Sequence, residues 1–351
     1  MPHLVSIPDL RLESGDTLVS PVVAYDAWGS LNKAADNAII VGHSLTSTTD
    51  AAKWWPSFIG PGLPLDTEKY FVICLNVLGS PYGSTSPVTV NPETGKLYGA
   101  DFPAVTIRDS VRAHKAALDI LGVNGVVLAI GGSMGGMQVL EWSTYESYVR
   151  AIAPVAVGGC HSPWGIAWTE AQRNAIFADP FWEGGRYAPD RPPIKGLATA
   201  RMMAMISYRT ADEFNARFQR SRSSEPGQPF LVETYLQHHG DRINERFDAN
   251  CYVQLTRQMN THDISRGRGE YLKVLSCITQ PTLVVGISSD ILYPLAEQEV
   301  LARHIPNASL KVIDAITGHD SFLIESEQIA AFVKPFLAGV KPRRTYQLIN
   351  A

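Results

Sequence analysis

The sequence feature that most constrains this chain is the stretch at residues 125–141, where an apolar run enters a glycine-rich turn and then a helix-compatible run. Residues 131–135 read Gly-Gly-Ser-Met-Gly and fit G-x-S-x-G, the pattern of a serine on a sharp turn between a strand and a helix. A serine hydroxyl is a weak nucleophile and must stand clear of the sheet to meet a base and a substrate. The turn therefore indicates Ser133 as a nucleophile. The alternative is an ordinary glycine-rich loop, such as one that binds phosphate.

Composition excludes several classes of protein. The 351 residues are 45% hydrophobic and 18% charged, which is typical of a globular chain with a large core. A net charge of −4 offers no basic field for nucleic acid or anionic membranes. We find no signal peptide and no apolar stretch near the ~20 residues of a membrane span. The cysteines are scattered, which predicts reduced thiols in a cytoplasmic protein and neither a disulfide frame nor a metal site. They are Cys74, Cys160, Cys251 and Cys277.

The order of apolar segments predicts a mostly parallel α/β sheet flanked by helices, with a helical lid inserted into it. Strands and helices alternate in residues 1–157, after an antiparallel meander, and again in residues 271–351. Residues 158–270 contain helix-like runs without a convincing strand. This pattern favours an α/β-hydrolase fold with a core of 1–157 and 271–351 and a lid of 158–270. We expect strands at 18–27, 37–41, 70–76, 149–157, 281–287 and 309–313, and helices at 106–121, 169–177, 197–208, 230–250, 295–304 and 321–337.

Two further residues complete a catalytic triad with Ser133. In this fold the triad follows the chain order serine, acid, histidine. Asp290 comes directly after the strand expected at 281–287, and His319 follows the strand expected at 309–313. The carboxyl ends of parallel strands gather at one edge of a sheet, where the sites of such sheets lie. His319 would take the serine proton, and Asp290 would hold the imidazole in the productive tautomer.

Other acidic residues compete with Asp290 for the third position. An aspartate after a strand is also a frequent turn or helix cap. Asp314 and Asp263 are weaker candidates for the acid. Asp320 is badly placed to bond the Nδ1 atom of the neighbouring histidine, but it is able to face a substrate.

An oxyanion hole needs two N–H donors. One is expected from the backbone of Met134, directly after the nucleophile, and the other from a loop after an early strand. Residues 42–46 form that loop, and we choose Leu45 as the donor. His43 is interpreted as a structural residue that bonds the loop. The remaining histidines, including His238 and His239, lack metal-ligand spacing.

Seven short motifs, spread over nearly the whole chain and its lid, together match one known family. They are Gly-His-Ser-Leu-Thr at 42–46, Asn-Val-Leu-Gly-Ser-Pro-Tyr-Gly-Ser at 76–84, Gly-Ser-Met-Gly-Gly-Met-Gln at 132–138, Glu-Ala-Gln-Arg at 170–173, Ser-Tyr-Arg-Thr at 207–210, Thr-His-Asp-Ile-Ser-Arg at 261–266 and Gly-His-Asp at 318–320. The chain resembles the homoserine O-acetyltransferase family of α/β-hydrolase-fold acyltransferases. Residues 79–82 are closer to its fungal branch, because bacterial members usually carry Gly-Cys at the positions of Ser80 and Pro81. The lid is shorter than in many fungal members.

The resemblance implies a two-step reaction of methionine biosynthesis with acetyl-CoA as co-substrate and no bound cofactor. Ser133 would take the acetyl group, and the hydroxyl of homoserine would then attack the acyl-enzyme with His319 as base. Arg173 would pair with the substrate carboxylate, and Asp320 would bind the amino group. Tyr208 would contact the substrate or the oxyanion region. The resemblance also implies a cytoplasmic homodimer joined through the lid.

The residues leave several alternatives open. An esterase passes through the same acyl-serine, so fold and triad do not separate it from a transferase. The acceptor is homoserine, serine or a secondary-metabolite alcohol, and the acyl group is acetyl or succinyl. Arg201, Arg209 and Arg266 are candidates for attracting the CoA phosphates, or are ordinary surface ion pairs. A non-catalytic binding protein is disfavoured because no triad member is missing.

Overall fold

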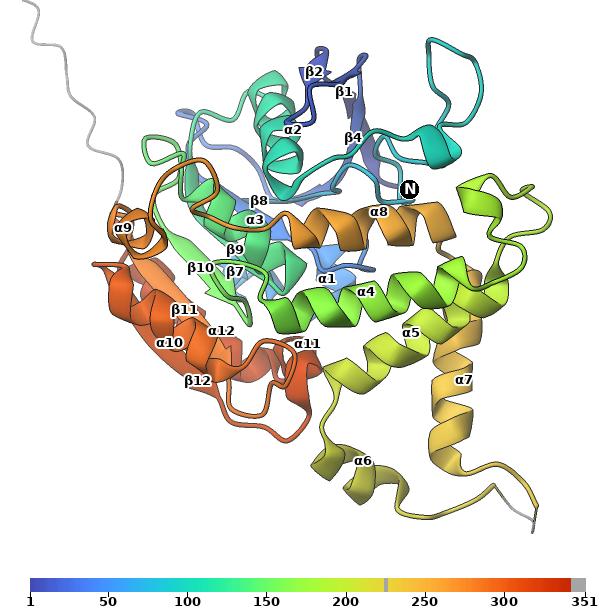
Figure 1. The fold of residues 1–351 in the computed structure, drawn as a ribbon. Coiled ribbons are helices and arrows are strands. Elements are labelled where there is room, and N and C mark those ends of the chain that lie inside the picture. The colour runs from blue at the N-terminus through green and yellow to red at the C-terminus, as the bar shows by residue number, and fades with distance from the viewer. Residues whose placement is uncertain (224–226, 342–351) are drawn as a thin grey trace, which may run out of the picture.

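The computed structural model describes residues 1–223 and 227–341, and its centre is an eight-stranded sheet (Figure 1). The strand order is β1-β4-β8-β5-β9-β10-β11-β12. β4 pairs antiparallel with both of its neighbours, and the other neighbouring strands run parallel. The predicted mostly parallel sheet is therefore confirmed. The strands are β1 (His3–Ser6), β4 (Val22–Trp28), β5 (Ala38–Gly42), β8 (Phe71–Leu75), β9 (Val126–Gly132), β10 (Ile152–Val155), β11 (Thr282–Ile287) and β12 (Ala308–Ile313).

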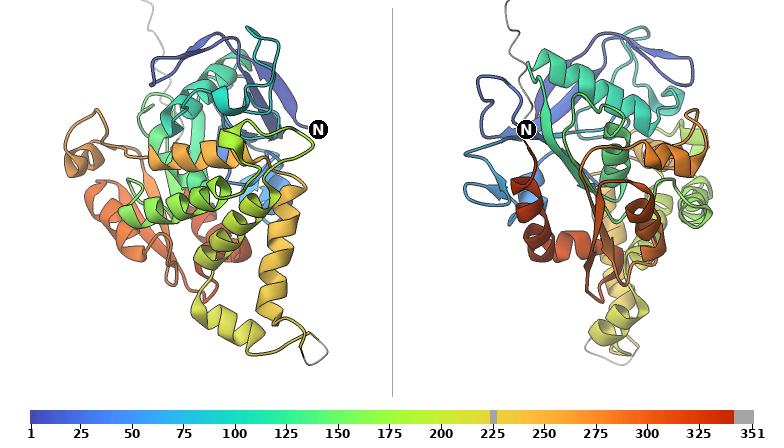
Figure 2. Two further views of the ribbon diagram at one scale, coloured as in Figure 1. Left: turned by 45° about the vertical axis from the view of Figure 1, so that its right-hand side comes forward. Right: turned by 90° about the vertical axis from the view of Figure 1, so that its left-hand side faces the viewer.

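Helices cover both faces of this sheet (Figure 2). Successive side chains of a strand point to opposite faces, so Ile40 joins one hydrophobic cluster while Ile39 and Val41 join the other. The first cluster is covered by α2 (Ile107–Ile120), α3 (Met134–Trp142) and α10 (Leu295–His304). The second is covered by α1 (Ala51–Trp54), α11 (Ser321–Ile324) and α12 (Ser326–Ala338). Two small sheets complete the core, β2 (Leu10–Arg11) with β3 (Thr17–Leu18) and β6 (Ile59–Gly60) with β7 (Leu65–Asp66).

The segment between β10 and β11 is helical, as expected. It holds α4 (Pro163–Phe177), α5 (Ile194–Tyr208), α6 (Ala211–Phe218), α7 (Leu231–Asn244), α8 (Ala249–Asn260) and α9 (Tyr271–Ser276). The beginning of this segment lies beside its later part. The Ile264 N–H donates to the Gly159 carbonyl at 3.0 Å, and the backbones of Cys160 and Asp263 form an isolated antiparallel β-bridge. The division of the chain at 157/158 and 270/271 remains a prediction.

Three expected helices have different bounds. The single helix expected at 230–250 is wrong, because a turn separates α7 from α8. Asp248 caps α8 by accepting from the Cys251 N–H at 3.0 Å. The helix expected at 321–337 is likewise divided into α11 and α12. The helix expected from residue 169 begins earlier, at Pro163, which suits a first turn, and Ser162 caps it. Residues 220–229 form a polar stretch whose sequence predicts an exposed loop, and this stretch lies partly outside the described residues.

The short elements and the thiols complete the description. In the described residues, short 3₁₀ helices form at η1 (Gly99–Asp101), η2 (Glu183–Gly185) and η3 (Gly318–Asp320). All four cysteines are free. Across 1–223 and 227–341, no helix combines the length and apolar character needed to cross a bilayer.

Candidate active site

Ser133 occupies a strained turn between β9 and α3. Its φ of 57° and ψ of −125° are rare for a residue with a side chain, and they aim the serine out of the sheet. The turn depends on a close backbone approach, since a Cβ added at Gly135 would stand 2.1 Å from the Gly42 carbonyl oxygen. Glycine at position 135 therefore lets the first turn of α3 rest on the end of β5, next to the nucleophile.

The structure brings His319 and Asp290 together at the same edge of the sheet. The His319 Nδ1 donates to Asp290 Oδ2 at 2.6 Å, and both residues are buried. Asp290 Oδ1 accepts from the backbone N–H groups of Leu292 at 2.8 Å and Tyr293 at 2.9 Å, which fixes the carboxylate. Among the described residues, His319 Nε2 has no hydrogen-bond partner, and it lines the same cavity as Ser133. This arrangement suits a proton transfer from the serine, for which apo geometry is often loose.

Aromatic rings enclose the histidine, and sequence reasoning missed two of them. Ring centres lie at 5.1 Å for Tyr293, 5.4 Å for Phe322 and 5.7 Å for Tyr208. The Tyr293 hydroxyl reaches His161 Nδ1 at 3.1 Å. Packing of this kind fixes the imidazole plane and keeps water away from it. A spacing of three brings side chains together only within a helix, which holds for His319 and Phe322 but not for Asp290 and Tyr293, so the sequence carried a signal for Phe322 alone.

The cavity at Ser133 has a volume of about 500 Å³ and contains most of the predicted site. Its lining includes Leu45, Tyr208 and Asp320 as expected. Among the described residues, the backbone N–H groups of Leu45 and Met134 donate to no acceptor. Two unpaired N–H groups at a buried serine are the arrangement that an oxyanion hole requires.

His43 has the structural surroundings that we expected. Its Nε2 accepts from the Val77 N–H at 3.0 Å, while its Nδ1 lies 2.9 Å from the Ser44 carbonyl. Its own carbonyl accepts from the Gln138 side chain at 3.2 Å. The imidazole thus ties the loop of Leu45 to neighbouring segments, and burial lowers its pKa to about 4.

Buried neutral histidines predict an acid-sensitive fold. Burial lowers the pKa of His43 to about 4 and that of His114 to about 3, below the ordinary value near 6.5. As the pH falls, the two imidazoles bind protons in the unfolded chain before they do so in the folded protein. The stability that the neutral histidines contribute is therefore present above pH ~6.5 and is lost as the pH falls toward 4. Denaturant unfolding at pH 7 and pH 4.5 should show a lower free energy of unfolding at pH 4.5. The fall should be smaller in His114→Gln and unchanged in the exposed control His3→Gln; equal falls in all three would contradict this origin.

Arg173 lies on a helix of the lid, as expected, and one of its guanidinium nitrogens is buried without a hydrogen-bond partner among the described residues, but it is not part of the Ser133 cavity. Its guanidinium is buried in α4 and donates to Glu170 at 2.5 Å. Arg201 of α5 lines the cavity instead, with its guanidinium carbon 5.6 Å from the ring centre of Tyr208. The other arginine candidates are engaged in ion pairs. Arg209 pairs with Glu213 and with Asp320, and Arg266 pairs with Glu13.

Comparisons with known proteins agree with this fold. The family described as alpha/beta hydrolase fold matches residues 37–326. A homoserine O-acetyltransferase of Salinibacter ruber is 55% identical over 97% of this chain and 98% of its own length. The structure of homoserine O-acetyltransferase from Bacillus anthracis has a TM-score of 0.90 at 25% identity, covering 98% of this chain and 99% of that one. Esterase E22 has a TM-score of 0.89 at 26% identity, covering 96% and 99%.

The fold and the arrangement of Ser133, His319 and Asp290 define an enzyme of the α/β-hydrolase class. Within that class, this chain belongs to the homoserine O-acetyltransferase family of acyltransferases. A fungal member, from Gibberella fujikuroi, is 44% identical over 95% of this chain and 87% of its own length. Of the two relatives, the bacterial one is the more identical, so these identities do not show the closeness to the fungal branch that residues 79–82 suggest.

Proposed function

We propose that this protein transfers the acetyl group of acetyl-CoA to the side-chain hydroxyl of L-homoserine, as a step of methionine biosynthesis. One observation carries the proposal. The cavity that contains Ser133 and His319 also presents a guanidinium, from Arg201, and a carboxylate, from Asp320. A charge of each sign beside an acyl-transfer centre matches the carboxylate and ammonium groups of an amino-acid acceptor.

The first half-reaction would acetylate Ser133. Its Oγ attacks the thioester carbonyl while His319 Nε2 takes the hydroxyl proton. The tetrahedral oxyanion accepts hydrogen bonds from the N–H groups of Leu45 and Met134. The carbon–sulfur bond then breaks, and the departing CoA sulfur receives the proton from His319.

The second half-reaction would regenerate the serine. The homoserine hydroxyl gives its proton to His319 and attacks the acetyl ester, and the proton then returns to Ser133 Oγ as that bond breaks. Asp320 has one oxygen 3.1 Å from the Arg209 guanidinium, which orients the carboxylate toward the acceptor's ammonium group. Burial raises the pKa of the Tyr208 hydroxyl, so it stays a neutral donor beside Arg201.

Arg201 replaces Arg173 as the residue that we expect to bind the acceptor carboxylate. Arg201→Ala should raise the KM for homoserine ~10- to 100-fold, since a hydrogen bond to a charged group contributes about 1.5–3 kcal/mol. Acetyl-enzyme formation should be largely spared. Arg173→Ala is the matched control, and it should destabilise the lid without a comparable change in KM. Steady-state kinetics in homoserine measure the difference, and a KM effect confined to Arg173→Ala would restore the first assignment.

A panel of donors and acceptors tests the proposed function directly. Acetyl-CoA or succinyl-CoA is mixed with homoserine, serine or no acceptor, and both free CoA and O-acyl product are followed. We expect O-acetylhomoserine from the first pair and little CoA release without acceptor. The structural likeness to esterase E22 makes hydrolysis the second candidate. CoA release without an acylated product would favour that activity.

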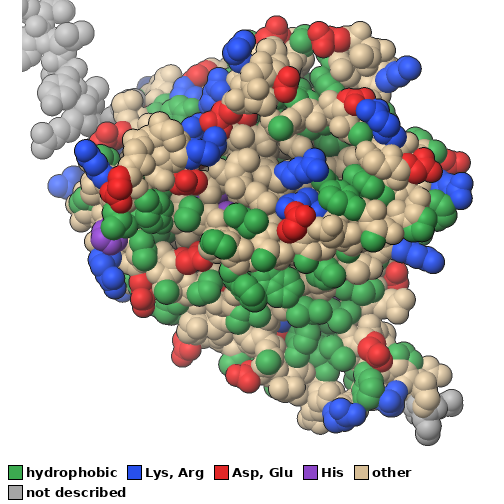
Figure 3. Space-filling view, in the orientation of Figure 1, with side chains coloured by type: hydrophobic (Ala, Val, Ile, Leu, Met, Phe, Trp, Pro, Cys, Tyr) green, Lys and Arg blue, Asp and Glu red, His purple; other side chains and the backbone are tan. Residues whose placement is uncertain are grey.

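The assembly and the cellular compartment are also part of the proposal. Apolar side chains gather over α4 and α5 on one face of the molecule (Figure 3). Exposed apolar residues of these two helices include Trp164 and Ile166 of α4 and Ile206 of α5, at 50%, 36% and 43% exposure. Such a patch favours a homodimer joined through the lid, residues 158–270. The free cysteines fit a cytoplasmic location, where thiols remain reduced.

A further inference from the structure

The side chains that line the Ser133 cavity carry a net positive charge, opposite in sign to that of the whole chain. The protein carries a net charge of −4, yet three cations line this cavity, Lys53, Arg201 and Arg246. Asp320 is the acidic residue that lines it, and Arg209 already pairs with that carboxylate. Arg201 suffices for an acceptor carboxylate, so two cations are left without a role in the proposed acceptor site.

Lys53 and Arg246 come from separate parts of the fold and converge on the same cavity. Lys53 lies in α1, is exposed, and forms no ion pair within the described residues. Arg246 lies between α7 and α8 and is also exposed. It donates to the Thr46 carbonyl at 2.7 Å and to the Tyr82 hydroxyl at 2.6 Å, both neutral groups. Neither positive charge is therefore neutralised by a carboxylate within ion-pair distance in the part of the chain described.

The size of the cavity decides where an anionic donor must place its charge. A volume of about 500 Å³ is typical of a pocket for a small ligand. It suits an acetyl group, an amino acid and part of the long arm of a CoA thioester. A CoA thioester carries its phosphates on a nucleotide at the far end of a long neutral arm. With the thioester at Ser133, that nucleotide has to lie outside the cavity, at its exposed mouth.

We propose that Lys53 and Arg246 form a phosphate-binding rim that recognises the nucleotide end of the acetyl donor. The inference rests on the proposed function and extends it to donor recognition. Each cation gains a charge-assisted contact with phosphate, and the pair raises the local concentration of polyanionic donors. A neighbouring hollow of about 370 Å³ shares Thr48 but carries Asp26 and Asp50, which repel phosphate and confine the donor to the Lys53 side.

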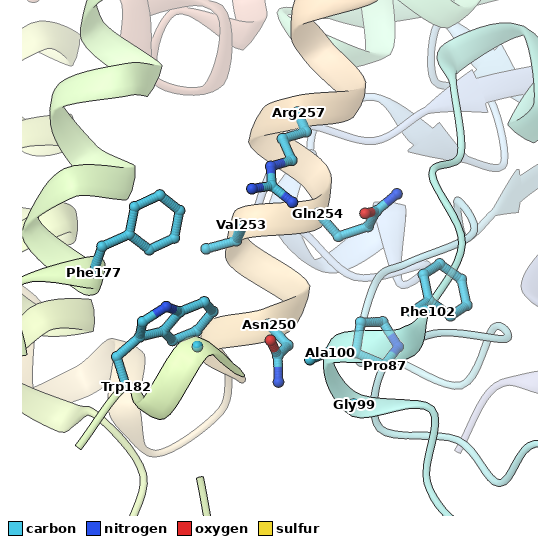
Figure 4. Close-up of a pocket in the computed structure, with 11 residues that line it drawn as sticks. Pro87, Gly99, Ala100, Phe102, Phe177, Trp182, Asn250, Val253, Gln254 and Arg257 are labelled. Carbon is cyan, nitrogen blue, oxygen red and sulfur yellow. The ribbon is translucent and has the colours of Figure 1, made fainter. Parts of the chain in front are cut away.

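Another cavity supplies the matched control. About 300 Å³ in volume, it lies between α4, η2 and α8, where the rings of Phe177 and Trp182 face Val253 (Figure 4). Arg257 lines it and is exposed, as Arg246 is, but none of the triad residues lines it. Arg257→Ala removes an exposed arginine charge without touching the proposed rim.

The test compares two thioesters at saturating homoserine, acetyl-CoA and S-acetyl-N-acetylcysteamine, which has no phosphate. Wild type should prefer acetyl-CoA in kcat/KM, and added NaCl should reduce that preference because salt screens exposed charges. Lys53→Glu should lower the ratio of the two kcat/KM values ~10-fold, and Lys53→Ala should lower it less. Arg246→Ala should lower the ratio and also slow both donors, because it releases Thr46 beside Leu45.

The possible outcomes distinguish a failure of the proposed phosphate-binding rim from a failure of the proposed acetyltransferase function. An unchanged ratio in Lys53→Glu, or an equal change in Arg257→Ala, overturns the rim while acetyl transfer stands. Absence of a wild-type preference for acetyl-CoA overturns it as well. Failure of both thioesters to acetylate homoserine overturns the proposed function itself.

Discussion

Replacement of Ser133 by alanine is expected to lower kcat on the order of 10⁶-fold and to abolish the acetyl-enzyme. The reason is chemical, because the variant lacks the oxygen that receives the acetyl group, while His319 and Asp290 stay in place. Intact-protein mass spectrometry after mixing with acetyl-CoA alone should show one added acetyl group on wild type and none on Ser133→Ala. Stopped-assay product formation from homoserine gives the kcat comparison.

A serine of the same cavity controls for the removal of a hydroxyl. Ser47 Oγ lies 2.7 Å from Ser44 Oγ, in the loop that follows β5. Ser47→Ala should still form acetyl-enzyme, since its hydroxyl bonds within the loop. If Ser133→Ala also accumulated the acetyl group, or turned over at the wild-type rate, the nucleophile would have to be assigned elsewhere.

The position of the triad could be predicted because strand ends determine it. Ser133, Asp290 and His319 follow β9, β11 and β12, whose carboxyl ends lie at one edge of the parallel sheet. Leu45 follows β5, which pairs with β9, so its loop lies beside the serine. A buried parallel strand is a strong sequence signal, and the residues after it have little freedom in where they lie.

The substrate arginine could not be placed in the same way. Arg173 and Arg201 both lie on lid helices, and helical spacing alone does not say which face of an inserted helix meets the site. Two weaker signals were present. Glu170 stands three positions before Arg173, a spacing at which helical side chains pair. Tyr208 stands seven positions after Arg201, two turns along the same face of α5.

The break between α7 and α8 shows a second limit of sequence reasoning. Residues 230–250 carry one continuous helix-like pattern, so the apolar spacing does not reveal a turn. The turn is set by a cap, Asp248, and by Phe247, which packs against Tyr82 and Tyr252. The cap is a local contact, whereas the packing of Phe247 against Tyr82 is tertiary, and tertiary packing can override local helix propensity. The cap and this packing also deliver Arg246 to the mouth of the cavity.

Replacement of Asp290 by asparagine is expected to lower kcat on the order of 10⁴-fold with little loss of stability. The Oδ1 position accepts two backbone N–H groups, from Leu292 and Tyr293, which an amide oxygen there would keep. The amide nitrogen would then face His319 Nδ1 in place of Oδ2. Because that nitrogen is a donor, the imidazole must carry its proton on Nε2, where it cannot accept the proton of Ser133.

The loop after β12, the strand next to β11, provides a matched control for Asp290→Asn. Asp314 follows β12 and accepts from the Ser288 hydroxyl at 3.3 Å, and it is one of the two weaker candidates for the acid. Asp314→Asn should keep kcat within a few-fold of wild type, whereas Asp290→Asn should slow acetylation and deacetylation alike, because both steps need a base at Nε2. Single-turnover measurements of the two half-reactions, with thermal unfolding as the check on folding, separate these effects. A large loss in Asp314→Asn with activity retained in Asp290→Asn would transfer the orienting role to Asp314.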